Sequence, residues 1–161
     1  MSKIIILLLS FFIASAASFN FTEIRYSDAL DRSMELKGEI SFLENGLTIK
    51  YKENKKSLQL LDGKILYSED GVNITLDQSK KQKIIQYFET IFLLHSGNEK
   101  LLQEMFEVQT NANFTLLTPK GTMRHFVTKI ELVKNEDRLK EIKLFLKNSD
   151  KITIIIDDEI R

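Results

Sequence analysis

The chain has 161 residues, with 23 basic and 23 acidic side chains, no cysteine and one proline. This charge balance excludes the basic surface that proteins binding nucleic acid or anionic membranes usually carry. Small secreted domains of eukaryotes usually need disulfides, so a chain without cysteine favours a bacterial periplasm. The single proline and the absence of low-complexity sequence predict one domain without a linker.

An export signal is predicted at the start of the chain. Lys3 supplies a positive charge, residues 4–13 form an apolar run with Ser10 as its one polar residue, and Ala14-Ser15-Ala16 resembles a cleavage site. The apolar run is about ten residues, shorter than the roughly 20 that cross a bilayer. We therefore expect a signal peptide at residues 1–17, cleaved near residues 16–17, and a monomeric periplasmic domain of residues 18–161 without stable membrane insertion.

The next part of the chain alternates apolar and polar residues, as half-buried antiparallel strands require. Residues 34–42 and 47–51 alternate on either side of Asn45-Gly46, which predicts a hairpin. Further turns are predicted at Asp62-Gly63 and Asp70-Gly71. Turn signals at roughly ten-residue spacing indicate a meander of about six strands.

A helical period replaces the alternation near Ser79. It predicts a helix from Lys80 to His95, ended by Ser96-Gly97, and a short helix from Glu99 to Phe106. About five strands follow, at residues 107–111, 113–117, 125–134, 139–147 and 151–157. The fold class predicted is α+β: an incomplete antiparallel β-barrel, a strongly curved sheet of about 11 strands, with a helical lid over its concave side.

Few residues are candidates for catalysis or metal binding. His95 and His125 are the only histidines and have no carboxylate at metal-ligand spacing beside them, so a structural role is predicted for both. No serine lies in a G-x-S-x-G motif, and the acidic run 157–159 is interpreted as a solvated end of a strand. We expect no enzymatic activity, no metal and no cofactor.

The remaining candidate surface is apolar. The longer helix has an apolar arc of about half its circumference, wider than the roughly 100° stripe of a surface helix, and it faces an apolar sheet. This arrangement forms either an ordinary packed core or a cavity for an acyl chain. If it is a cavity, we expect its lipid-binding residues to be Leu36, Ile40, Phe42, Leu47, Ile49, Phe88, Ile91 and Phe92.

Two segments resemble the periplasmic outer-membrane lipoprotein carrier (LolA) family. Residues 61–67, LDGKILY, resemble its SDGKxLW hairpin, and residues 113–120, NFTLLTPK, resemble its FxLTPK strand. The resemblance covers residues 21–156 and implies an open barrel with a helical lid that shields the acyl chains of lipoproteins. It also implies acylated lipoprotein cargo, an inner-membrane donor complex and an outer-membrane acceptor.

One departure from the family and one alternative function accompany this resemblance. The family's RPxxF segment, whose arginine helps to latch the lid, aligns with residues 44–48, where there is no arginine. We therefore expect another contact to close the lid. The alternative is a periplasmic module that uses the same half-barrel to bind or sense another lipid or a protein tail.

Overall fold

The computed structural model describes residues 17–160 apart from Asn54 and Asp137. Residues 1–16, which make up nearly all of the expected signal peptide, lie outside this range. Within the described residues, no helix is long and apolar enough to span a membrane.

Six strands precede two α-helices and five strands follow them, in the order predicted from the sequence. The first strands are β1 (Ala17–Ser27), β2 (Arg32–Leu43), β3 (Gly46–Tyr51), β4 (Lys56–Leu61), β5 (Lys64–Glu69) and β6 (Val72–Ile74). The helices are α1 (Gln78–Ser96) and α2 (Glu99–Met105). The last elements are β7 (Phe106–Thr110), β8 (Thr115–Pro119), the 3-10 helix η1 (Gly121–His125), β9 (Val127–Asn135), β10 (Arg138–Leu146) and β11 (Lys151–Glu159).

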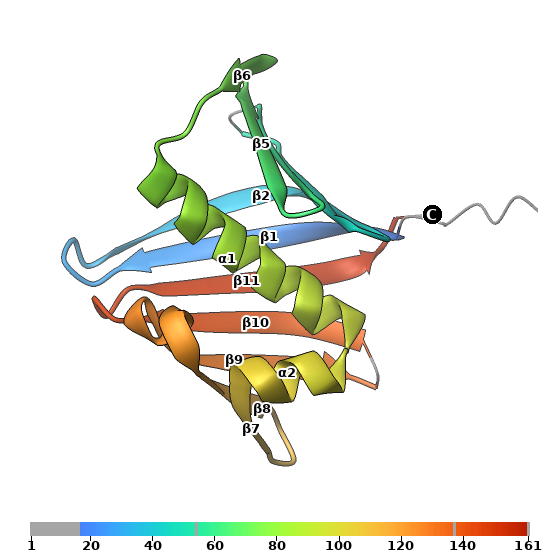
Figure 1. The fold of residues 1–161 in the computed structure, drawn as a ribbon, viewed down its shortest axis with the longest axis vertical. Helices are drawn as coiled ribbons and strands as arrows, with labels where there is room; N and C mark the ends of the chain where they lie inside the picture. Colours follow the sequence, from blue (N-terminus) through green and yellow to red (C-terminus); the bar gives the residue numbers. More distant parts are fainter. Residues whose placement is uncertain (1–16, 54, 137, 161) are drawn as a thin grey trace, which may run out of the picture.

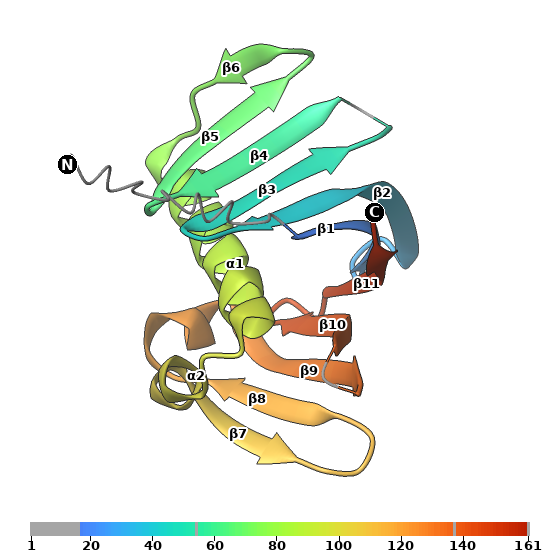
Figure 2. The same cartoon turned by 90° about the vertical axis from the view of Figure 1, so that its right-hand side faces the viewer.

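The strands form one 11-stranded antiparallel sheet in the order β6-β5-β4-β3-β2-β1-β11-β10-β9-β8-β7. The first and last strands pair in the middle of this sheet, where Thr22 lies opposite Ile155. The two edge strands, β6 and β7, are far apart, so the barrel is open. Figure 2 shows the sheet curving around α1, which confirms the predicted half-barrel with a helical lid on its concave side.

Two of the three predicted turns are confirmed. Asp62 and Gly63 have φ of 49° and 71°, and Asp70 and Gly71 have φ of 51° and 79°, as tight hairpin turns require. The prediction at Asn45-Gly46 is wrong by one residue, because the turn is Glu44-Asn45 and Gly46 belongs to β3. Glycine is needed there for another reason: a Cβ at Gly46 would lie 1.8 Å from the carbonyl oxygen of Leu60 on β4.

The lid helix α1 is capped at both ends. The Asp77 side chain accepts a hydrogen bond from the Lys80 backbone N–H, and Gly97 ends the helix with φ of 65°. The helix crosses the sheet diagonally, as Figure 1 shows. His125, predicted to begin a strand, is instead the last residue of η1.

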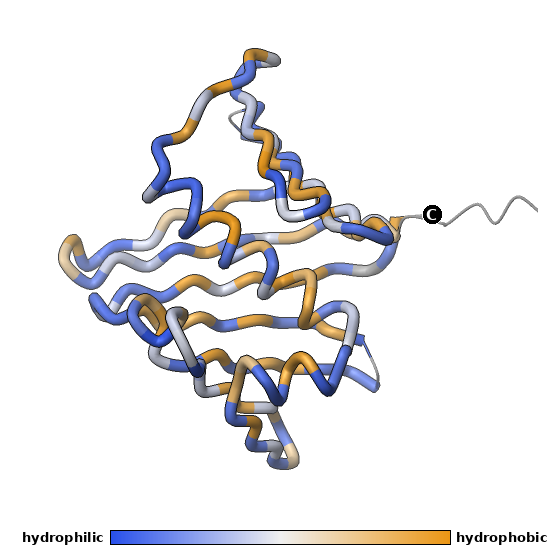
Figure 3. The backbone as a smooth tube through the Cα atoms, viewed as in Figure 1, coloured by the Kyte–Doolittle hydropathy of each residue, from blue (hydrophilic) through white to orange (hydrophobic). Residues whose placement is uncertain are grey.

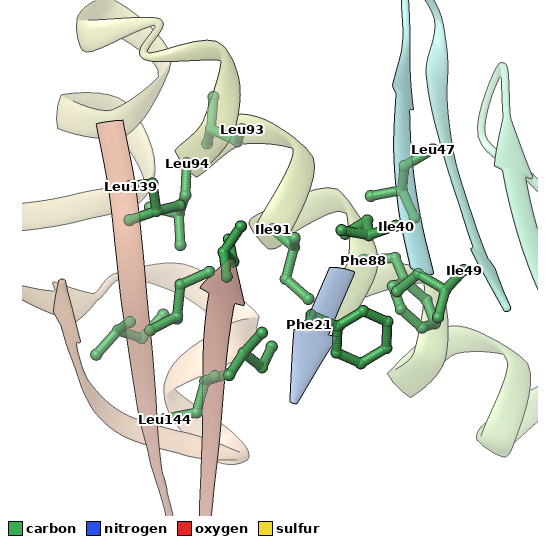
Figure 4. Close-up of a cluster of buried hydrophobic side chains, with 14 of the residues drawn as sticks. Phe21, Ile40, Leu47, Ile49, Phe88, Ile91, Leu93, Leu94, Leu139 and Leu144 are labelled. Atoms are coloured by element: carbon green, nitrogen blue, oxygen red, sulfur yellow. The ribbon is translucent and has the colours of Figure 1, made fainter. Parts of the chain in front are cut away.

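The core lies between α1 and the concave face of the sheet. Figure 3 shows apolar residues alternating with polar ones along the strands that α1 covers. Figure 4 shows Phe88 and Ile91 of α1 directed toward side chains of the sheet. Both are at most 2% exposed, and Leu47 and Ile142 are completely buried. Burial of this apolar surface holds the lid on the sheet.

Candidate functional site

A cavity of about 490 Å³ lies beneath the N-terminal half of α1, between that helix and η1. Its walls come from α1, η1, β1 and the ends of β9, β10 and β11. The volume is within the range of about 300–1,000 Å³ that is usual for ligand pockets. The lining residues are Arg25, Lys83, Ile84, Gln86, Tyr87, Met123, His125, Phe126, Val127, Leu144, Leu146, Lys147, Asn148 and Ile152.

The inner wall of the cavity is apolar. Met123, Val127 and Leu144 are buried and belong to the hydrophobic core, while Leu146 and Ile152 are partly buried. The cavity therefore continues the core toward solvent. Such a wall favours non-directional contact with an apolar group, because its side chains keep apolar surface away from water.

Three contacts join α1 to η1 and the residue after it. Lys83 Nζ lies 5.3 Å from the centre of the Phe126 ring, a cation–π distance. Gln86 Nε2 lies 3.5 Å from Thr122 Oγ1, and Thr90 Oγ1 lies 3.8 Å from Met123 Sδ. These contacts are weak, and they lie between the N-terminal half of α1 and the η1 segment.

A charged cluster on the concave face adjoins the cavity. Glu23 of β1 is 1% exposed, its carboxylate is paired with Arg25 Nε, and it accepts a hydrogen bond of 2.8 Å from the Tyr51 hydroxyl. Burial lowers the pKa of Arg25, but the negative charge of Glu23 and its hydrogen bond outweigh that effect and leave the pKa raised. Arg25 therefore stays cationic at the cavity wall.

Tyr87 connects this cluster to α1. Its hydroxyl is buried without a hydrogen-bond partner among the described residues. Burial, followed by the negative charge of Glu23, raises the pKa of the Tyr87 hydroxyl. The hydroxyl is therefore neutral and can still donate a hydrogen bond.

The eight sequence-predicted lipid-binding residues lie outside this cavity, five on the sheet beneath α1 and three on α1 itself. Ile40, Phe42, Leu47, Ile49, Phe88 and Ile91 are buried in the core, and Leu36 and Phe92 are partly buried against it. The structure brings these residues together in one apolar cluster. None of them lines the 490 Å³ cavity, which lies toward the N-terminal end of α1.

His95 fixes the other end of α1 to the sheet. Its ring stacks on Phe42 of β2 with centroids 3.6 Å apart and planes 8° apart, and it meets the edge of Phe19 at 5.8 Å. Burial lowers the pKa of His95. The structural role predicted for this residue is thus a ring contact between the lid and the sheet.

We expect His95 to make the fold sensitive to acid. The folded pKa of His95 is below its unfolded value of about 6.5, so the unfolded chain binds an extra proton, and stability is lost as the pH falls below about 6.5. Chemical denaturation at about pH 7.5 and pH 5.5 should show a smaller loss in His95→Gln than in the wild type. His125→Gln, at an exposed position, is the control. An identical loss in His95→Gln and the wild type would contradict this role.

The part of the chain that the structure describes contains no group of three or more His, Cys, Asp or Glu side chains that could hold a metal ion. The residues that line the cavity offer apolar contact, positive charge and hydrogen bonding.

No protein-family profile matches the chain, and no curated protein matches it. Among solved structures, a LolA superfamily protein from Nitrosomonas europaea is similar, with 9% sequence identity and a TM-score of 0.45 over 93% of this chain and 88% of that one. A likeness at this level assigns neither a family nor a function to the chain.

Proposed function

We propose that this protein is a periplasmic carrier that shields the acyl chains of lipoproteins during their transfer to the outer membrane. The observation that carries the proposal is the 490 Å³ cavity with an apolar inner wall between the lid and the sheet. The segments at residues 61–67 and 113–120 support it, since they resemble the LolA family and the half-barrel that this resemblance implies is the observed fold.

The energetics of an apolar cavity suit a carrier. Each buried methylene is worth about 0.8 kcal/mol, so a chain of about fifteen methylenes gains on the order of 12 kcal/mol when it is fully covered. Full coverage would hold the cargo too tightly to release. A cavity that is open toward solvent covers only part of the chain, and the contacts of α1 with η1 beside it, at Lys83, Gln86 and Thr90, are weak.

The eight sequence-predicted residues form a second surface for cargo in this proposal. They are packed against each other while α1 lies on the sheet. If α1 moves away, the five on the sheet become an apolar face continuous with the cavity through buried core residues such as Leu144, and the three on α1 become a facing one. Cargo with more than one acyl chain would then contact both surfaces.

A blocked cavity tests this proposal. Ile84 and Ile85 are neighbours on α1 and both are partly buried, but only Ile84 lines the cavity. We expect Ile84→Trp to fill the cavity and weaken binding of a dansyl-labelled triacylated lipopeptide by on the order of tenfold, which corresponds to about 1.4 kcal/mol. Ile85→Trp should bind within about twofold of the wild type. Fluorescence titration measures both, and the same peptide without acyl chains is the ligand control.

Two outcomes would count against the proposal in different ways. Failure of the wild type to bind the triacylated peptide would remove the carrier function. Equal binding by Ile84→Trp and the wild type would move the acyl site away from the cavity.

A carrier must also release its cargo, so labelled peptide should pass to added liposomes. Peptide that stays on the protein would favour the alternative, a lipid-binding or sensor module.

A further inference from the structure

The acyl cavity is lined by cations and by no carboxylate. Arg25, Lys83 and Lys147 line it together with His125, and none of the lining residues is Asp or Glu. The whole chain has equal numbers of acidic and basic side chains. The positive charge is therefore a local property of this cavity and does not follow from the composition.

The two lysines have no carboxylate partner in the described part of the chain. Lys83 contacts the face of Phe126, and Lys147 has no ion pair or side-chain hydrogen bond with a described residue. Both are exposed at the rim of the cavity. Their ammonium groups are available to a ligand.

Arg25 retains unused donors. Its Nε is paired with Glu23, and its Nη2 lies 3.5 Å from the Tyr51 hydroxyl. A guanidinium carries five N–H donors, so others remain for a ligand. The Arg25 side chain is 45% exposed, and it lines both the 490 Å³ cavity and an adjacent one of about 250 Å³.

Two carboxylates accompany Arg25, Glu23 beside it and Asp150 in the adjacent 250 Å³ cavity, and both are occupied by other contacts. Glu23 is held by Arg25 and Tyr51. Asp150 accepts hydrogen bonds from the Asn148 side chain at 2.7 Å and from the Asp28 backbone N–H at 2.9 Å. Neither carboxylate forms an ion pair with Lys83 or Lys147 in the described residues. The rim therefore attracts an external anion.

We propose that this cavity binds single-chain amphiphiles with an anionic head, with the chain on the apolar wall and the head between Lys83, Lys147 and Arg25. The proposal rests on the proposed function, since it takes the cavity to be an acyl site, and it adds a ligand class to the lipoprotein cargo. A carboxylate or phosphate accepts charge-assisted hydrogen bonds from these cations, which are stronger than bonds between neutral groups. The carboxylate of a fatty acid and the phosphate of a lysophospholipid share this chemistry.

Three probes share a sixteen-carbon chain and differ in the head: palmitate, hexadecanol and palmitoyl lysophosphatidic acid. Comparing their affinities separates the contribution of the head to binding from that of the chain. Calorimetric titration of the wild type should give a palmitate affinity on the order of tenfold above that of hexadecanol. Salt should weaken the binding of palmitate and leave that of hexadecanol nearly unchanged. The stronger of the two anionic probes identifies the preferred head, carboxylate or phosphate.

Charge variants then locate the head. Lys83→Gln/Lys147→Gln should bind palmitate on the order of tenfold more weakly and hexadecanol about as well as the wild type. Lys83→Arg/Lys147→Arg should restore palmitate binding. Lys64→Gln/Lys100→Gln removes the same charge from two exposed positions outside the cavity, and it should bind palmitate as the wild type does.

The outcomes distinguish this proposal from the carrier function. If hexadecanol binds as tightly as either anionic probe, or if Lys83→Gln/Lys147→Gln binds palmitate normally, head recognition is overturned and the carrier function stands. If none of the three probes binds and the triacylated lipopeptide does not bind either, the acyl site itself is overturned.

Discussion

Replacing Phe88 by alanine is expected to lower the free energy of unfolding by about 3–5 kcal/mol. Phe88 is 2% exposed and packs from α1 into the core that Figure 4 shows. Its loss leaves a space that the rigid sheet beneath α1 cannot fill, so the cost includes both lost burial and the cavity. Denaturation in urea measures the change. Phe92→Ala should cost less, because Phe92 is only partly buried.

Phe126→Ala is the matched control for this prediction. Phe126 is 40% exposed and lines the 490 Å³ cavity, so its truncation should leave stability within about 1 kcal/mol of the wild type and weaken the proposed acyl binding. Phe88→Ala should show the reverse, lost stability with binding of single-chain palmitate retained. A stable Phe88→Ala protein that no longer binds palmitate would place a single acyl chain under the middle of α1, among the eight residues that the sequence predicts, and would contradict the cavity as its site.

The fold could be predicted from the sequence because its signals are local. Alternation along residues 34–42 is confirmed by burial of Gly38, Ile40 and Phe42 on one face of β2. The turn at Asp62-Gly63 depends only on the positive φ angles of these two residues, so it can be read from them alone. The turn prediction at Gly46 is wrong because the need for glycine comes from the Leu60 carbonyl on another strand. Sequence spacing carries no information about such a distant contact.

The cavity could not be predicted for a related reason. Periodicity indicates which side chains face the concave side but not where two apolar faces meet. The middle of α1 meets the sheet at Phe88 and Ile91, so the predicted residues form core. The start of α1, at Lys83 and Ile84, leaves a space against η1 and the ends of β9–β11. These segments are far apart in the chain, and their approach depends on the curvature of the whole sheet.

The charged cluster is absent from the sequence-based predictions, although the sequence contains a signal for it. One face of β1 carries every second residue, which includes Phe21, Glu23 and Arg25. Phe21 is buried in the core. A carboxylate two residues from a buried phenylalanine in a strand is expected to face the same side. It then needs a partner, which Arg25 and Tyr51 supply.

Removing Arg25 should therefore destabilise the fold through Glu23. A partner lost from a fully buried ion pair costs about 3–5 kcal/mol. The Arg25 side chain is 45% exposed and water screens part of its charge, so we expect Arg25→Met to cost about 2–3 kcal/mol. The reason is that Glu23, at 1% exposure, is left in the core with the Tyr51 hydroxyl as its remaining hydrogen-bond donor.

A double-mutant cycle with urea denaturation isolates this interaction. Glu23→Gln/Arg25→Met removes both charges and should be more stable than the sum of the two single losses predicts, by about 1 kcal/mol or more. The exposed pair Lys37–Glu35, 3.3 Å apart with side chains 58% and 54% exposed, is the matched control. Lys37→Met should cost less than about 1 kcal/mol, since surface pairs contribute little. If the two single losses in the free energy of unfolding are additive, Glu23 and Arg25 do not stabilise the fold as a pair. That result would contradict the role proposed for their interaction.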